Sequence, residues 1–115
     1  MKNLHKVLAA VATFAASNPN GFTFNLETME AQRTGFAVAR AETQDSFGES
    51  GLFKAVVFAL ANNVPCVGGW YDAESGLFYY DATEILTDKN EAKSRANDNG
   101  QIAFFDLDKC EEIRV

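Results

Sequence analysis

The sequence predicts an α+β fold in which a mostly antiparallel sheet packs against helices. A ββα pattern occurs twice, over residues 21–60 and 67–97, and the two strands of each pattern are too close in sequence for a parallel crossover. The chain has 115 residues, of which 47% are hydrophobic, so it can bury a core without a metal or disulfide framework. We therefore expect one domain over residues 1–115, with the order αββαββαβ and the repeated ββα unit packed against helices.

The first element is predicted to be a helix over about residues 3–17. Its apolar residues recur every three or four positions and therefore share one side: Leu4, Val7, Leu8, Val11, Phe14 and Ala15. A basic start and small residues at the end also resemble a secretory signal. We favour a folded helix that residues 18–21 terminate, because the apolar region of a signal needs no such stripe.

The first ββα unit begins with a strand at Gly21, in which every second residue is apolar. Residues 35–41 provide the return strand of the expected hairpin. A polar loop over residues 42–49 follows. Ser50 is then expected to be the N-cap of a helix that reaches residue 62.

This second helix is mostly apolar, and we expect it to be the central one on which the sheet packs. Phe53 and Val57 are among the residues expected in its buried face. The helix ends before Pro65, because a proline restricts the residue that precedes it to extended backbone.

The second ββα unit begins with a strand that contains Trp70 and Tyr71. Asp72 is expected to start the turn of this hairpin and Gly76 to take the left-handed position in it. The return strand reaches about Leu86. Its alternation places one set of side chains on one face, Phe78, Tyr80 and Ala82, and a second set on the other, Leu77, Tyr79 and Asp81.

A short third helix is predicted to begin with a capping box formed by Asp88 and Glu91 and to end at residues 99–100. Its apolar side is thin, so it should be the least stable helix. Residues 101–107 are apolar on both faces and predict an interior strand, after which residues 108–111 turn the chain toward its end.

The net charge of −6 and a pI near 4.6 oppose direct binding to nucleic acid and to anionic membranes. No segment reaches the roughly 18 apolar residues of a membrane span, so we expect a soluble, cytoplasmic protein. Cys66 and Cys110 are expected to be reduced, with no histidine nearby in sequence to form a metal site. We expect no cofactor and no catalytic residue, because no nucleophile is paired with a base.

Two segments are candidate binding sites. The second hairpin offers the aromatic residues Trp70, Tyr71 and Tyr79, with Asp72 and Glu74 at its tip. Some of these rings must lie outside the core if helices cover only one face of the sheet. Core packing of the rings is the alternative.

The polar loop over residues 42–49 is the second candidate. Glu42, Gln44 and Asp45 lie shortly before a helix N-terminus, where backbone amide groups can bind a polar ligand. The alternative is an ordinary polar connection.

Three stretches, ETQDSFG at residues 42–48, VGGWYD at 67–72 and QIAFFDL at 101–107, resemble a group of small acidic proteins from bacterial and phage mobile elements. The resemblance covers most of the chain after residue 21. It implies no catalytic residue. What it implies is a context, because small acidic proteins of mobile elements often act by binding a host protein, sometimes one that normally binds DNA.

We therefore expect a non-catalytic protein-interaction or regulatory module, rather than a hydrolase or a transferase, with an unknown protein as its partner. One alternative is a DNA-mimicking inhibitor of a DNA-binding protein. It would need carboxylates spaced like phosphates, drawn from Asp45, Glu49, Asp72, Glu74, Asp106, Asp108, Glu111 and Glu112. Another is a small enzyme that uses the 42–49 loop and the aromatic hairpin, which a concave pocket with a strained carboxyl or Cys66 would favour.

Overall fold

The computed structural model describes residues 3–115. In these residues, the helices and strands follow one another along the chain as α1 (Leu4–Ser17), β1 (Gly21–Asn25), β2 (Glu30–Ala31), β3 (Phe36–Ala39), the 3-10 helix η1 (Ala41–Thr43), α2 (Gly48–Ala61), β4 (Cys66–Asp72), β5 (Leu77–Leu86), α3 (Lys89–Asp98), β6 (Ala103–Asp106) and β7 (Glu111–Arg114). The strands form one sheet in the order β2-β1-β4-β5-β3-β6-β7, and every neighbouring pair is antiparallel. The predicted α+β fold with an antiparallel sheet is confirmed, and β2 and β7 are short strands that the predicted order did not contain.

The first helix and the second hairpin form as predicted. Asn3 caps α1 by accepting a hydrogen bond from the backbone amide of Lys6, at 3.2 Å. Residues from the predicted apolar stripe of α1 are buried against the sheet. Strands β4 and β5 pair along the whole length of β4, and Gly76 takes the left-handed conformation in their turn, with a φ of 72°. None of the helices in residues 3–115 has the length and apolar character that crossing a bilayer requires.

The predicted hairpin between β1 and β3 is not formed. β1 pairs with β2 and β4, whereas β3 pairs with β5 and β6. The chain reverses early because Asn25 Oδ1 accepts hydrogen bonds from the amides of Glu27 and Thr28, and Met29 then adopts a left-handed φ of 59°. β4 and β3 pair with opposite edges of β5. The 42–49 loop lies along the first half of the edge that β3 uses, at Tyr79 and Tyr80, so β3 pairs with the second half.

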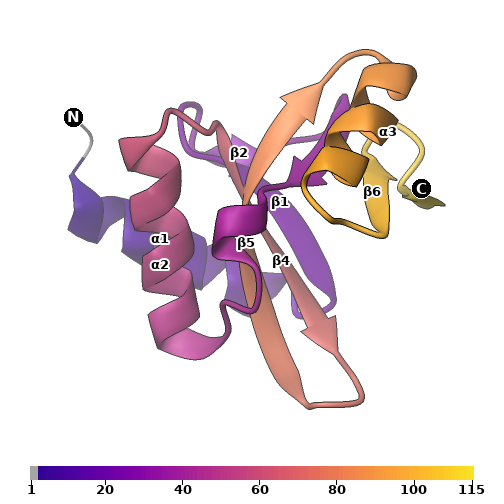
Figure 1. The fold of residues 1–115 in the computed structure, drawn as a ribbon. Coiled ribbons are helices and arrows are strands. Elements are labelled where there is room, and N and C mark those ends of the chain that lie inside the picture. The colour runs from indigo at the N-terminus through magenta and orange to yellow at the C-terminus, as the bar shows by residue number, and fades with distance from the viewer. Residues whose placement is uncertain (1–2) are drawn as a thin grey trace.

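Helices α1 and α2 cover β1, β4 and the first half of β5, where Val56, Val67 and Ala82 are fully buried. Helix α3 covers β3 and β6 through its two buried residues, Ala92 and Ala96, as its thin apolar side predicts. Figure 1 shows α1 and α2 together beside the β4–β5 hairpin, and α3 next to β6 at the C-terminal end of the fold. The helices thus bury two separate core clusters.

Both core clusters lie on the same face of the sheet. Val38 is paired with Glu84, which lies two residues after Ala82 and therefore points to the same side of β5. Between the clusters, Glu84 forms ion pairs with Arg40 at 3.8 Å and with Arg95 at 2.9 Å. Because α1, α2 and α3 all pack on this face, the opposite face of the sheet carries no α-helix from residues 3–115.

Helix α2 is the central helix, but its start and its buried face differ from the prediction. Its N-cap is Phe47 rather than Ser50, because a bridge between Phe47 and Tyr79 fixes the backbone just before the helix. Phe53 and Val57 are 51% and 36% exposed, so the expectation that they lie in the core is wrong. A helix turns by about 100° per residue, and the sheet instead receives Leu52, Ala55, Val56 and Ala59.

The neighbouring residues Val56 and Val57 give a matched test of this orientation. We expect Val56→Ala to lower the free energy of unfolding by about 2 kcal/mol, because it leaves a cavity at a fully buried position. Val57→Ala should cost less than about 0.5 kcal/mol, since the side chain is partly in water and alanine favours the helix. Urea denaturation of both variants measures the difference. Equal losses would contradict the orientation of α2.

Candidate functional site

The helix-free face of the sheet is hollowed into a trough of about 890 Å³. Cross-strand partners form two rows on this face. The first row crosses β1, β4, β5 and the end of the 42–49 loop, and each of its residues is the cross-strand partner of the next: Gly21, Trp70, Tyr79 and Phe47. We call it the aromatic row. The next row contains Thr23, Gly68 and Asp81, paired across the same three strands.

The 42–49 loop lies directly along β5. The amide of Tyr80 donates a hydrogen bond to the carbonyl of Ser46 at 2.8 Å, and the amide of Ala82 donates one to Thr43 Oγ1 at 2.9 Å. This antiparallel register extends the second row, because it brings Asp45 alongside Asp81. We call Thr23, Gly68, Asp81 and Asp45 the polar row. The two candidate segments of the sequence therefore meet at one site.

Trp70 is held by stacking on one side only. Its ring is nearly parallel to that of Tyr79, with ring centroids 4.7 Å apart and an interplanar angle of 15°. The partner of Trp70 on the other side is Gly21, which has no side chain to cover the indole. Trp70 is 47% exposed and lines the trough, so the outer face of its ring is free to contact a ligand.

The floor beside Trp70 is made of backbone. A Cβ atom on Gly68 would lie 2.9 Å from Thr83 Oγ1, so a larger residue would crowd Thr83. Gly68 and Gly21 both line the trough. Two glycines at these positions keep a slot open next to the aromatic ring.

Asp81 is the carboxyl of the trough whose ionisation is most perturbed. Burial raises its pKa from an ordinary 3.8 to about 6, and the charge of Asp45 also raises it. The Trp70 side chain opposes both effects, because its indole N–H donates a hydrogen bond to the carboxyl. Asp81 therefore changes its charge near neutral pH and does so in direct contact with Trp70.

Three of the residues predicted to form a site come together on the helix-free face, and of these Trp70 lines the trough. Trp70 and Tyr79 stack, and Asp45 lies at the end of the polar row. Tyr71 does not join them. It is 50% exposed, but strand alternation turns it to the helix face, where it lines a different cavity.

The other four predicted residues lie outside the trough. Asp72 accepts a hydrogen bond from the amide of Glu74 at 3.1 Å and so stabilises the hairpin turn. Glu42 is paired with Arg40 at 2.8 Å, and the guanidinium hydrogen bond lowers the pKa of this exposed carboxyl. Gln44 is exposed at the end of η1.

Two residues of the site were missed at the level of sequence. Alternation had already placed Asp81 on the same face as Tyr79, so a carboxyl within an aromatic strand was a usable signal. Phe47 was read only as part of a polar loop. Its ring meets Tyr79 edge-on with centroids 5.8 Å apart, a contact that depends on the loop lying along β5.

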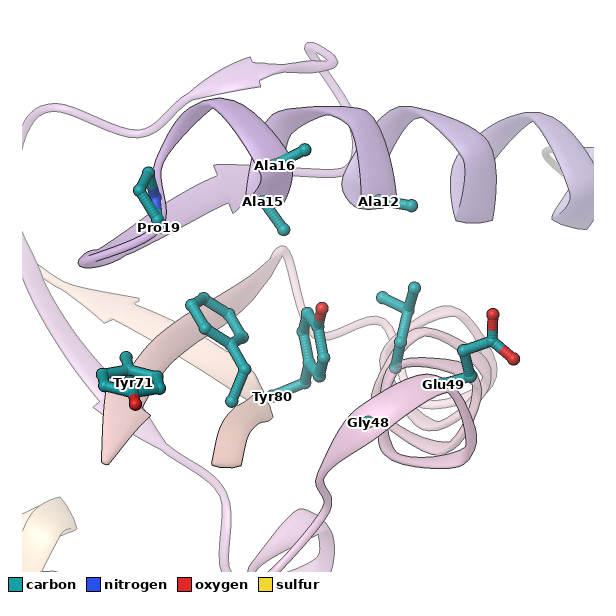
Figure 2. A pocket seen from close by; sticks show the side chains of 10 residues that line it. Ala12, Ala15, Ala16, Pro19, Gly48, Glu49, Tyr71 and Tyr80 are labelled. Atoms are coloured by element: carbon teal, nitrogen blue, oxygen red, sulfur yellow. The ribbon is translucent and has the colours of Figure 1, made fainter. Parts of the chain in front are cut away.

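A smaller cavity of about 540 Å³ lies on the helix face, between α1, the start of α2 and the β4–β5 hairpin. Figure 2 shows Tyr71 and Tyr80 on its hairpin side, with Tyr80 pointing toward α1 and its residues Ala12 and Ala15. Burial raises the pKa of the Tyr80 hydroxyl, as expected where little water reaches it. Most of its lining is apolar, which leaves fewer polar groups to orient a ligand than in the trough.

The cysteines give no support to nucleophilic catalysis. Cys66 is buried on β4, and burial raises the pKa of its thiol to about 12, so it stays protonated at neutral pH. Cys110 is exposed in the β6–β7 turn, and both thiols are free. Within residues 3–115, no three or more His, Cys, Asp or Glu side chains are grouped to hold a metal ion.

Comparison with known protein families, curated proteins and solved structures finds no match for this chain. The functional argument consequently depends on the trough itself. Its three relevant features are the concave shape, the aromatic row with the uncovered face of Trp70, and the polar row with Asp81.

Proposed function

We propose that this chain is a non-catalytic protein-interaction module that binds its partner in the trough. The observation that carries the proposal is the outer face of Trp70, a large aromatic surface left uncovered at the wall of a concave site. The resemblance to proteins of mobile elements suggests that the partner is a host protein, met in the cytoplasm.

The aromatic row supports this proposal because its rings already pack against one another in the absence of a partner. Trp70 is stacked on Tyr79, and Tyr79 is in turn held edge-on by Phe47. A side chain that is already fixed loses little conformational entropy on binding. Rings of this kind, surrounded by polar groups, are typical of the residues that contribute most to protein interfaces.

The acidic residues favour the trough over a DNA-mimicking surface. Asp72, Asp106 and Asp108 accept hydrogen bonds from backbone amide groups, at 3.1, 3.2 and 3.0 Å respectively. Asp106 is also buried. Carboxylates engaged in hydrogen bonds to the backbone are poor substitutes for the evenly spaced and solvated phosphates of DNA.

Trp70 and Tyr71 provide a matched test, because they are adjacent, similarly exposed and on opposite faces of β4. We expect Trp70→Ala to weaken binding of the captured partner about tenfold or more, since it removes the aromatic wall of the trough. Tyr71→Ala should change binding less than about twofold. Affinity capture from the native cell identifies the partner, and titration of the purified partner against each variant measures the effect.

Circular dichroism and urea denaturation must first show that both variants are folded. Full binding by a folded Trp70→Ala variant would refute the trough as the interface. Loss of binding in Tyr71→Ala alone would instead assign the interface to the helix-face cavity of Figure 2.

One observation favours a catalytic alternative, namely the carboxyl of Asp81 in a concave site with a pKa near 6. Such a group can donate and accept a proton at neutral pH. Asp81→Asn distinguishes the two functions. If Asp81 acts as an acid or base, the variant keeps its affinity for the captured molecule and loses turnover, whereas an interface residue affects affinity itself.

A further inference from the structure

The space beside Trp70 combines an aromatic face with a carboxyl. The outer side of the indole borders the slot above Gly21 and Gly68, and its N–H contacts Asp81 at one end of that slot. A group that enters the slot therefore meets a π-face and a carboxylate at the same time. Cations are attracted to both.

The carboxylates of the polar row form no ion pair among residues 3–115, although Arg33 and Arg114 also line the trough. The ion pairs formed in this part of the chain join Arg40 and Arg95 to acidic residues on the helix face, and Arg114 to Glu112 on β7. No ion pair involves Asp81 or Asp45. Asp81 and Asp45 instead lie side by side and repel each other. A bound cation would relieve this repulsion.

The shape of the slot selects among cations. It is bordered by a flat ring, floored by glycine backbone, and flanked by the hydroxyl-bearing residues Thr23 and Thr83. A guanidinium group is planar, is weakly hydrated, stacks on aromatic faces and offers several N–H donors to carboxylates. An ammonium group is compact and strongly hydrated, and it therefore stacks less well on the flat indole ring.

We propose that the trough binds an arginine side chain of the partner protein, with its guanidinium stacked on Trp70 and paired with the carboxyl of Asp81. This inference rests on the proposed function, because it names the chemistry that the same site recognises. Asp45 adds negative charge at the end of the polar row. The net charge of −6 complements a basic segment on the partner.

The test uses the single tryptophan of the chain, whose indole N–H gives one distinct NMR signal. N-acetylarginine amide is titrated into the ¹⁵N-labelled protein, and the isosteric, neutral N-acetylcitrulline amide serves as the matched probe. We expect the arginine probe to shift the Trp70 indole signal saturably, and the citrulline probe to bind at least about tenfold more weakly, because it has no charge to pair with Asp81. The affinity of Nα-acetyllysine amide, whose side-chain ammonium is free, should lie between those of the other two probes.

The variant Asp81→Asn should lose about tenfold in affinity for the arginine probe. Asp98→Asn, an exposed carboxyl at the end of α3, should retain it. Equal binding of the arginine and citrulline probes, unchanged binding by Asp81→Asn, or the lack of any saturable shift would each overturn the inference. If one of these results occurs while Trp70→Ala still loses the protein partner, the proposed function stands and only the arginine is wrong. If Trp70→Ala keeps the partner, the proposed function fails independently of the probe.

Discussion

We expect Gly51→Ala to destabilise the protein by about 3 kcal/mol, even though alanine favours a helix more than glycine does. A Cβ atom on Gly51 would clash with the carbonyl carbon of Ser46 and lie 2.8 Å from its oxygen. That oxygen also accepts the hydrogen bond from the amide of Tyr80, so the Ser46 backbone is held on both sides. The substitution must push α2 away from the 42–49 loop or pull the loop from β5.

Denaturant unfolding measures this loss, and Ser50→Ala is the matched control on the same turn of α2. Ser50 is exposed, so its replacement should change stability by less than about 0.5 kcal/mol. NMR signals of Phe47 and Asp45 should move in the Gly51→Ala variant, because the loop that carries them is displaced. An unchanged midpoint would show that α2 does not approach the loop this closely.

The second large effect is expected at Asp81. Asp81→Asn should raise the free energy of unfolding by up to about 3 kcal/mol at pH 7, because the wild-type carboxyl must ionise in a partly buried position beside Asp45. The asparagine keeps an oxygen that can accept the hydrogen bond from the indole of Trp70. Only the charge is removed.

The pH dependence identifies this cause. The pKa of Asp81 is about 6 in the folded chain and near 3.8 when unfolded, so between these values the folded state binds more protons than the unfolded state. The contribution of Asp81 to stability therefore falls as the pH rises from about 4 to about 6, and the full cost remains above that range. The difference between Asp81→Asn and wild type should grow over the same range and then level off.

Unfolding curves recorded from pH 4 to pH 7 measure this difference, and Asp98→Asn controls for the loss of one negative charge. A stability difference between Asp81→Asn and wild type that does not change over the range would contradict a raised pKa. A less stable Asp81→Asn variant at pH 7 would show that the carboxylate has a favourable partner in the fold. The expected loss of stability from the charge of Asp81 fits a binding role, because charged groups in concave sites are often kept for function.

Local patterns in the sequence correctly predicted the elements that depend on neighbouring residues. The apolar spacing of α1, the N-cap Asp88 of α3 and the left-handed Gly76 in the β4–β5 turn were confirmed. The capping box was not, because Asp88 accepts its hydrogen bond from the amide of Asn90 rather than from that of Glu91. Each of these features is decided within a few residues, by helical periodicity, by a capping side chain or by the conformational freedom of glycine. The α+β fold follows from the order of such elements.

Strand pairing was less predictable because it depends on contacts between distant segments. β1 and β3 look like partners in sequence, yet an early turn at Asn25 sends the chain into β2, and β3 joins the edge of β5 opposite β4. The buried side of α2 was uncertain for a related reason. Nearly all of its positions are apolar, so periodicity could not exclude Phe53 and Val57, and only packing against the sheet chose Val56.

Part of the candidate site could be predicted from the sequence. The sequence determined that Trp70, Tyr79 and Asp81 lie on a hairpin, with Tyr79 and Asp81 on one face of its return strand, and that Asp45 lies in a polar loop. Only the tertiary structure placed the loop along β5, put Gly21 beside Trp70 and left this face of the sheet without a helix. The physical reason is that cross-strand register and layer packing join residues far apart in the chain, and local propensity carries no information about which distant segment will be the neighbour.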